Sequence, residues 1–151
     1  MVQAEYIKPS TSNWKIFGEQ IYEIEQEEFK DKSLDKKMMI TDINNPNVIL
    51  VLLKKNNLVI GFSYALPENQ TTARIVDTVI KKEYQGKRLI SEIMKIMEKK
   101  LREIGYKYMS REAMVENGYA KKITKNYNSR ILETKESTGT WGRQIYFKIQ
   151  L

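Results

Sequence analysis

The stretch IVDTVIKKEYQGKRLISEIM, residues 75–94, decides the fold. It begins with β-branched residues typical of a strand, passes through a short polar turn at Gly86, and continues with helical spacing. Apolar residues then recur at offsets of three, four, seven, eleven and fourteen before Gly105, at Ile90, Ile93, Met94, Met97, Leu101 and Ile104. This pattern predicts a strand, a turn and a long helix that lies on a sheet.

The turn of this unit has the properties of an anion-binding site. The backbone N–H groups of residues 86–90 come at the start of the helix, where they have no intrahelical partner and the helix dipole is positive. Gly86 permits close approach to the backbone, and Lys87 and Arg88 add positive charge. The turn therefore either binds a group such as a pyrophosphate or is an ordinary helix start with two solvated basic residues.

The rest of the chain alternates between strand-like and helix-like segments, with no repeat and no Gly/Pro-rich linker. We expect one domain over residues 1–151, with an α/β or α+β architecture in which helices flank a mixed sheet. Strands are expected at 2–7, 73–80, 106–115, 130–136 and 142–151, and a hairpin at 48–66 that turns around Asn56 and Asn57.

Helices are expected in two further places. Two come before the hairpin, and Ser33 is expected to cap the second of them with Met38 on its inner face. A short one is expected within residues 117–127. Residues 135–142, KESTGTWG, are expected to form an exposed hairpin loop, in which Trp141 either lines a pocket or covers the edge of the core.

The composition excludes several kinds of chemistry. The chain has no cysteine and no histidine, which excludes disulfides, thiol nucleophiles and the serine or cysteine sites that need a histidine base. No segment resembles a signal peptide or a membrane span, so we expect a cytoplasmic protein without a membrane partner. The net charge of +7 is compatible with an anionic partner but does not identify one.

The order of elements and the turn together resemble the GNAT superfamily of N-acetyltransferases. Their signature is a Q/R-x-x-G-x-G/A loop after a strand, and the matching residues here are Ile80, Glu83, Tyr84, Gln85 and Gly86. The chain departs from the signature at the two glycine positions, which are occupied by Arg88 and Ile90. The resemblance implies a mostly antiparallel, twisted sheet of about six to seven strands with about four helices.

The resemblance also implies acetyl-CoA as the co-substrate and no metal. Its pyrophosphate is expected at the turn, and its pantetheine arm is expected beside the strand that ends at Ile80. The implied cofactor-binding residues are Val79, Ile80, Gln85, Gly86, Lys87, Arg88, Leu89, Ile90 and Asn117.

Direct attack of an amine on a thioester needs a base, and GNAT enzymes often use a carboxylate near the centre of the sheet. Asp77 is the first candidate, because a carboxylate on a central strand is costly to bury without a partner. The alternative is a structural role for Asp77, either in an ion pair with Arg74 or in a contact with solvent at the end of the strand. Glu112, on the neighbouring predicted strand, is the second candidate and has the same alternative.

The acid that protonates the leaving thiolate is commonly a tyrosine in this superfamily. An alignment anchored on Asn117 places this position at Thr124, whereas one anchored on the following strand places it at Tyr127. We favour Tyr127, because a phenol donates a proton more readily than the threonine hydroxyl. A purely structural role for Tyr127 is the alternative, and Tyr119 is a third candidate.

The acceptor is expected to be an amine of unidentified structure. The first predicted helix carries glutamates that either attract a cationic acceptor or form a solvated face, at Glu19, Glu23, Glu27 and Glu28. Two other functions remain as alternatives: a GNAT-like module that binds without catalysis, and a nucleic-acid-binding protein, which the lack of a stacking platform disfavours. Both a monomer and a homodimer are compatible with the sequence.

Overall fold

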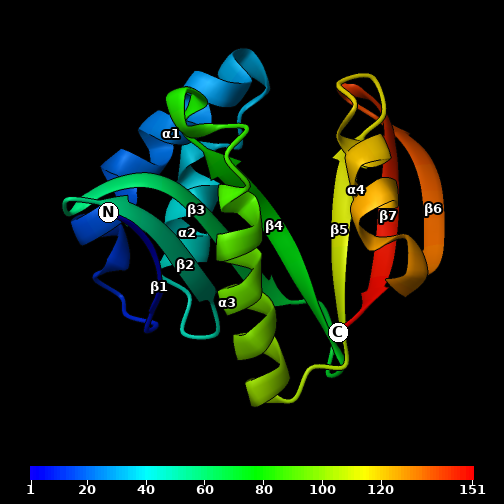
Figure 1. Cartoon of the computed structure of the whole chain (residues 1–151), viewed down its shortest axis with the longest axis horizontal. Helices are drawn as coiled ribbons and strands as arrows, with labels where there is room; N and C mark the ends of the chain where they lie inside the picture. The colour runs from blue at the N-terminus through cyan, green and yellow to red at the C-terminus, as the bar shows by residue number, and fades with distance from the viewer.

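The computed structural model describes residues 1–151. The chain forms seven strands and four α-helices, together with one π-helical turn and three short 3-10 turns (Figure 1). In chain order they are β1 (Val2–Ile7), η1 (Trp14–Gly18), α1 (Glu19–Phe29), η2 (Lys30–Lys32), α2 (Lys36–Ile43), β2 (Ile49–Lys55), β3 (Leu58–Pro67), β4 (Thr72–Ile80), η3 (Lys82–Tyr84), α3 (Leu89–Ile104), β5 (Tyr108–Met114), α4 (Tyr119–Tyr127), η4 (Asn128–Arg130), β6 (Ile131–Gly139) and β7 (Gly142–Gln150).

The strands form a single sheet in the order β1-β2-β3-β4-β5-β7-β6. Every neighbouring pair is antiparallel except β4 and β5, which are parallel because α3 connects them as a crossover. The predicted hairpin is present, and Asn56 and Asn57 occupy its turn with φ of 52° and 68°. The mixed, mostly antiparallel sheet flanked by four helices is the predicted fold class.

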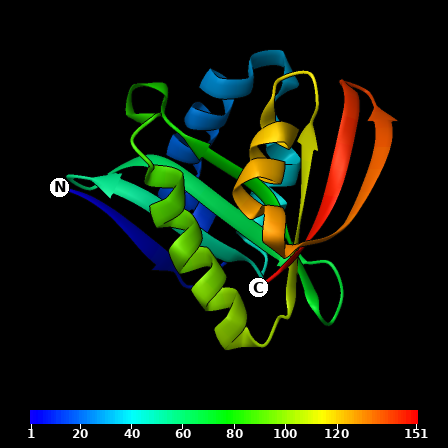
Figure 2. The same ribbon diagram turned by 45° about the vertical axis from the view of Figure 1, so that its right-hand side comes forward.

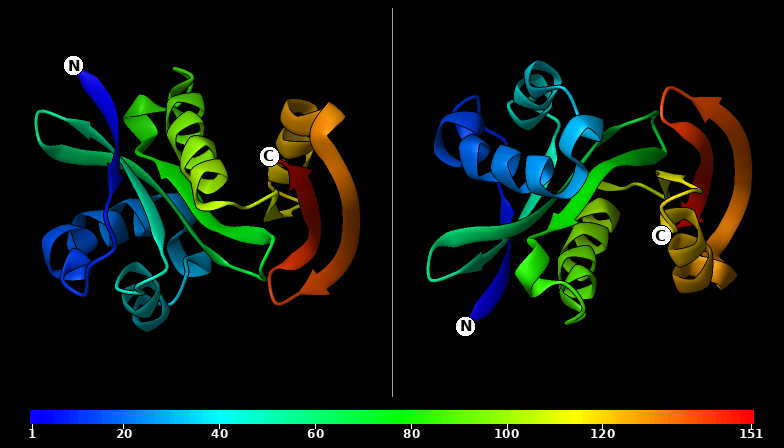
Figure 3. Two further views of the ribbon diagram at one scale, coloured as in Figure 1. Left: turned by 90° about the horizontal axis from the view of Figure 1, so that it is seen from below. Right: turned by 90° about the horizontal axis from the view of Figure 1, so that it is seen from above.

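Helices cover both faces of the sheet (Figures 2 and 3). On one face α1 and α2 enclose a core that includes Leu50 and Leu52, and on the other face α3 and α4 enclose a core that includes Val51 and Leu53. These four side chains alternate along β2, so this strand is buried on both sides. Burial on both sides explains why its sequence is a continuous apolar run rather than an alternating one.

The prediction for α2 was wrong in detail. Asp35, not Ser33, caps this helix, and its Oδ2 accepts a hydrogen bond of 3.1 Å from the backbone N–H of Met38. The later start changes which residues face inward. Met39 is fully buried, whereas Met38 is 41 % exposed.

The inner face of α3 is shorter than predicted. Ile93, Met97 and Leu101 are fully buried, but Ile90 is 47 % and Ile104 is 54 % exposed. Ile104 is the last residue before the chain turns at Gly105, and Ile90 lies at the mouth of the cleft described below. None of the helices is long and apolar enough to cross a membrane.

The predicted loop at residues 135–142 is mostly strand. β6 continues to Gly139, and only Thr140 and Trp141 form the turn before β7, because Gly139 pairs directly with Gly142. Trp141 is 46 % exposed and does not line the cleft. The tight turn therefore places it at the end of the hairpin.

A β-bulge in β4 determines which way Asp77 points. Ala65 pairs with Ile75 and Tyr64 pairs with Asp77, so Val76 is an extra residue on β4. Ile75 faces the core under α3, and strict alternation would place Asp77 on that same face. The bulge instead aligns Asp77 with Tyr64, on the face covered by α1 and α2.

Candidate active site

A large cleft opens where two parallel strands part. β4 and β5 pair only as far as Ile75 and Arg111, and beyond this point they diverge (Figure 1). The cleft has a volume of about 1430 Å³ and is lined by both strands, by α1 on one side and by α3 and α4 on the other. The edge of β4 over residues 76–80 is therefore free of a strand partner and faces the cleft.

The turn before α3 lies at one end of this cleft. Gly86 has φ of 80°, and Arg88 has φ of 60° and ψ of 22°, so both residues adopt the left-handed conformation. This conformation strains Arg88, because only glycine adopts it without a steric cost. The backbone thus takes a shape suited to glycine at a position where the sequence has arginine.

The backbone N–H groups in this turn are available to a ligand. No side chain caps α3, and no turn or cap hydrogen bond uses an N–H group of residues 86–90. Leu89 packs against the core behind the turn, while the exposed Ile90 and Arg88 line the cleft. Lys87 does not line the cleft, and its ammonium lies 5.7 Å from the centre of the Tyr84 ring.

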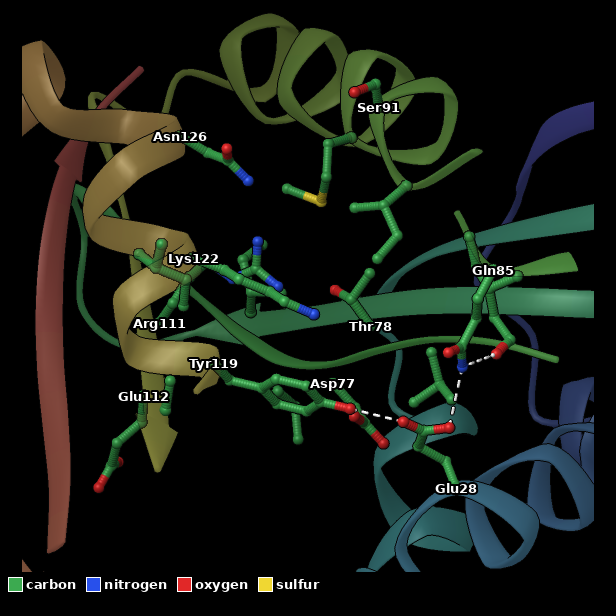
Figure 4. Close-up of a pocket in the computed structure, with 18 of the residues that line it drawn as sticks. Glu28, Asp77, Thr78, Gln85, Ser91, Arg111, Glu112, Tyr119, Lys122 and Asn126 are labelled. Atoms are coloured by element: carbon green, nitrogen blue, oxygen red, sulfur yellow. Dashed lines mark hydrogen bonds between the residues drawn. The ribbon is translucent and has the colours of Figure 1, made fainter. Parts of the chain in front are cut away.

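A chain of hydrogen bonds crosses the cleft from α4 to α1 and on to the turn (Figure 4). The Tyr119 hydroxyl donates to Oε1 of Glu28 at 2.5 Å, and the Gln85 side-chain amide donates to Oε2 of Glu28 at 2.9 Å. The same amide nitrogen of Gln85 donates to the carbonyl of Ile80 at 2.8 Å. Burial, and then the hydrogen bond to Glu28, raises the pKa of Tyr119. Glu28 of α1 therefore links α4 to the turn before α3.

Asp77 lies in the cleft beside this chain (Figure 4). It forms no ion pair with Arg74, which is exposed, so the predicted ion pair between these two residues is absent. Burial raises the pKa of Asp77 well above its usual value. The neighbouring Glu25 carboxyl raises this pKa further, whereas the Thr78 backbone and Arg111 oppose the shift.

The two positions predicted for the acid, Tyr127 and Thr124, lie in different surroundings. Tyr127 lines the cleft, is half-buried, and its hydroxyl lies 3.5 Å from a guanidinium nitrogen of Arg111. Thr124 is exposed, does not line the cleft, and donates its hydroxyl hydrogen to the carbonyl of Ala120 at 3.0 Å. Of these two, the structure brings only Tyr127 to the cleft.

The other predicted site residues lie at the edges of the cleft. Glu112 is exposed at the edge of the cleft, and Figure 4 shows its carboxylate turned away from Asp77. Asn117 lies at the start of α4, where its Oδ1 accepts a hydrogen bond of 3.0 Å from the backbone N–H of Tyr119. Val79 and Ile80 are buried residues on the free edge of β4.

Charge is divided between the two sides of the cleft. Most basic lining residues come from the turn before α3 and from α3, β5, α4 and η4, at Arg88, Lys95, Arg102, Arg111, Lys122 and Arg130, and one, Lys32 of η2, follows α1. Two of these, Arg102 and Arg130, pair with Glu98. Across the cleft, Glu25 and Glu28 of α1 and Asp77 form no ion pair with lysine or arginine.

Sequence reasoning missed Glu25. The buried residues of α1 are Ile21, Ile24 and Glu25, so this glutamate lies on the apolar face of the helix. Its position one residue after Ile24 and four after Ile21 was the available signal, because a charged residue on an apolar face needs a reason to be there.

Comparison with known proteins identifies the family. Residues 18–125 match the profile of the Acetyltransferase (GNAT) family, so the chain belongs to this family. No curated protein matches the chain.

Solved structures of GNAT acetyltransferases share the fold across the whole chain. The ribosomal-protein-S18-alanine N-acetyltransferase of Escherichia coli is 14 % identical with a TM-score of 0.76, covering 99 % of this chain and 94 % of that one. A GNAT acetyltransferase from Elizabethkingia anophelis with acetyl-CoA bound is 13 % identical with a TM-score of 0.73, covering 99 % and 98 %. The PaiA N-acetyltransferase of Thermoplasma acidophilum in complex with coenzyme A is 13 % identical with a TM-score of 0.71, covering 99 % of both chains.

Proposed function

We propose that this protein transfers an acetyl group from acetyl-CoA to a primary amine by direct attack. The observation that carries this proposal is the arrangement of the cleft. Backbone N–H groups without partners lie at one end, and the half-buried carboxylate of Asp77, which has no ion-pair partner, lies at the other. The free edge of β4 connects them.

The residues of the cofactor side fit the chemistry of CoA. The N–H groups of residues 86–90 and the dipole of α3 suit a pyrophosphate, and Arg88, Lys95 and Lys122 add positive charge around it. The free edge of β4 offers backbone groups to the amides of a pantetheine arm. Acetyl-CoA supplies a thioester whose carbonyl carbon an amine can attack.

Asp77 and Tyr127 are the residues proposed to move protons. Asp77 points to the α1 side of β4 and takes a proton from the acceptor ammonium. Tyr127 lies on the side of α3 and α4 and gives its hydroxyl proton to the departing sulfur. The two groups therefore act from opposite sides of the parted strands, which keeps acid and base separate.

The acceptor is proposed to arrive as a cation. Glu25, Glu28 and Asp77 outnumber Lys32 among the charged residues that line the acceptor side of the cleft, which favours an ammonium group. Similar folds serve acceptors of different sizes, because one solved relative is named for the alanine of a ribosomal protein and another is an aminoglycoside 6'-N-acetyltransferase. The charge of the cleft therefore defines a class of acceptor rather than a single molecule.

Acetyl-CoA binding tests the proposal directly. At one hundred times Kd, acetyl-CoA should stabilise the protein by about 2.7 kcal/mol and raise Tm by roughly 5–10 °C. The Gly86→Pro variant should bind acetyl-CoA at least tenfold more weakly, because proline fixes φ near −65°, whereas Gly86 needs +80°. Isothermal titration calorimetry measures both affinities.

Gly105→Ala is the matched control. It places alanine at another left-handed position, φ of 114°, at the opposite end of α3 and away from the cleft. Its acetyl-CoA affinity should equal that of the wild type. Equal affinities for Gly86→Pro and Gly105→Ala would exclude the turn as the binding site. Mass spectrometry of a panel of amines incubated with acetyl-CoA then identifies the acetylated acceptor, and a panel without any product would contradict the activity.

A further inference from the structure

Glu25 is the most deeply buried acidic residue of the molecule, and the chemistry described so far gives it no role. It is 1 % exposed, and its Oε2 accepts a hydrogen bond of 2.8 Å from the backbone N–H of Leu34. Its second oxygen, Oε1, is buried and has no donor. A carboxylate held in this way between α1 and the sheet is costly unless another group satisfies it.

The Asp77 carboxyl is the group that faces it. Both side chains line the same cleft, and Oδ2 of Asp77, like Oε1 of Glu25, is buried without a donor. Two ionised carboxylates only accept hydrogen bonds, so they cannot bond to one another. One proton between them would satisfy both oxygens, as in a pair of carboxyl groups that share a site.

No cation neutralises the pair directly. Neither residue forms an ion pair, and no cluster of ligands suited to a metal ion is present. The groups around the pair are Arg111 of β5, Tyr64 of β3 and Tyr119 of α4. Arg111 alone among these carries a positive charge, and it opposes rather than outweighs the effect of burial.

We infer that Glu25 is a positioning residue for the reaction, which holds one proton jointly with Asp77 and so makes Asp77 a stronger proton acceptor. This inference rests on the proposed function, in which Asp77 is the base. In the active form neither carboxyl is protonated. An N–H bond of the acceptor ammonium breaks, an O–H bond to Asp77 forms, and the proton is then shared with Glu25. The charge of the pair changes from −2 to −1 while the ammonium becomes a neutral amine.

The shared proton has a consequence for stability that does not depend on activity. The pKa of Asp77 is raised in the folded protein, so Asp77 keeps a proton at pH values where an unfolded aspartate, with a pKa near 3.9, has lost it. The folded state therefore binds more protons than the unfolded state above about pH 4. The free energy of unfolding must fall as the pH rises through this range.

Glu25→Gln tests the pair with little change in shape. The glutamine carbonyl can still accept from Leu34, and its amide can donate to Asp77, so the shared proton is no longer needed. We expect the Tm of Glu25→Gln relative to wild type to rise as the pH is raised above about 4, the pKa of an unfolded aspartate. Glu23→Gln, an exposed change on the same helix, should differ from wild type by a constant amount. A constant difference for Glu25→Gln as well would overturn the inference.

Asp77→Asn is the second variant, and it keeps the test decisive if Glu25→Gln does not fold. It replaces the other carboxyl of the pair and so also removes the shared proton. Its Tm relative to wild type should show the same rise with pH. Combining both substitutions should add no further pH dependence, because only one proton is shared.

The kinetic test separates this inference from the proposed function. With an amine that the wild type acetylates, the acidic limb of the pH profile of kcat should move to lower pH by about one unit in Glu25→Gln. An unmoved limb would mean that Glu25 is only structural. If no amine is acetylated, the proposed function fails, while the pH dependence of Tm still decides whether the carboxyls share a proton.

Discussion

The two sides of the cleft offer different kinds of chemical group to a ligand. On the α3 side the groups proposed to hold the cofactor are mainly backbone N–H groups and an unpaired strand edge, which nearly any residue can supply, and Tyr127 is the one side chain proposed to react there. On the α1 side they are the side chains of Glu25, Glu28 and Asp77, which only those residues can supply. The α3 side can therefore tolerate Arg88 in place of glycine, whereas the α1 side should be sensitive to the loss of a single oxygen or proton.

Tyr127→Phe should have the largest effect, because it removes one side-chain hydroxyl from the proposed chemistry. We expect kcat to fall by about a hundredfold, with acetyl-CoA affinity unchanged, since the backbone groups of the turn remain. Steady-state kinetics at saturating acceptor measure the first quantity and calorimetry the second.

Thr124→Ala is the control, because it lies on the same helix at the position favoured by the other alignment. It should leave kcat unchanged, since Thr124 is exposed outside the cleft. A wild-type kcat in Tyr127→Phe, or a fall only in Thr124→Ala, would reverse the choice between these two residues.

The second prediction concerns the helix that carries Glu25 and Glu28. The π-helical turn η1 leads directly into α1, and Trp14 lies against the backbone of Gly18. A Cβ at position 18 would lie 2.2 Å from a ring atom of Trp14. We expect Gly18→Ala to lower the free energy of unfolding by about 2 kcal/mol, because a rigid ring must be displaced from a packed site. Chemical denaturation measures this change.

A double-mutant cycle shows whether the ring is the cause. In a Trp14→Ala background, Gly18→Ala should cost much less, because the clash is gone. An undiminished cost would point to the backbone conformation instead. The affinity for acetyl-CoA should be the same in all four proteins, since neither Trp14 nor Gly18 lines the cleft.

Local patterns were sufficient to predict much of the fold. The helical spacing in α3 and the two asparagines of the hairpin act within a few residues of themselves, so they can be read without knowing the rest of the structure. The caps and inner face of α2 were missed because Ser33 and Asp35 are equally good N-cap residues. The choice between them depends on how the chain leaves α1.

The acceptor side could not be predicted in the same way. The bulge at Val76 arises from the pairing between β3 and β4. No feature of the local sequence IVDTVI predicts it. Without the bulge, Asp77 and Glu25 would lie on different faces of the sheet. The pairing of these two carboxyls therefore depends on contacts between segments that are about fifty residues apart in the sequence.

The smallest predicted effect concerns Arg88, where the sequence departs from the family signature and the backbone does not. Its left-handed φ of 60° is unfavourable for arginine and for alanine but not for glycine. Arg88→Gly should therefore be more stable than Arg88→Ala by about 1 kcal/mol, as measured by urea denaturation. Both variants lose the same charge, so both should weaken acetyl-CoA binding equally and by less than Gly86→Pro does. A larger loss of affinity in Arg88→Gly than in Arg88→Ala would show that the strained arginine holds the turn open for the ligand. The backbone alone would then not be sufficient to build the α3 side of the cleft.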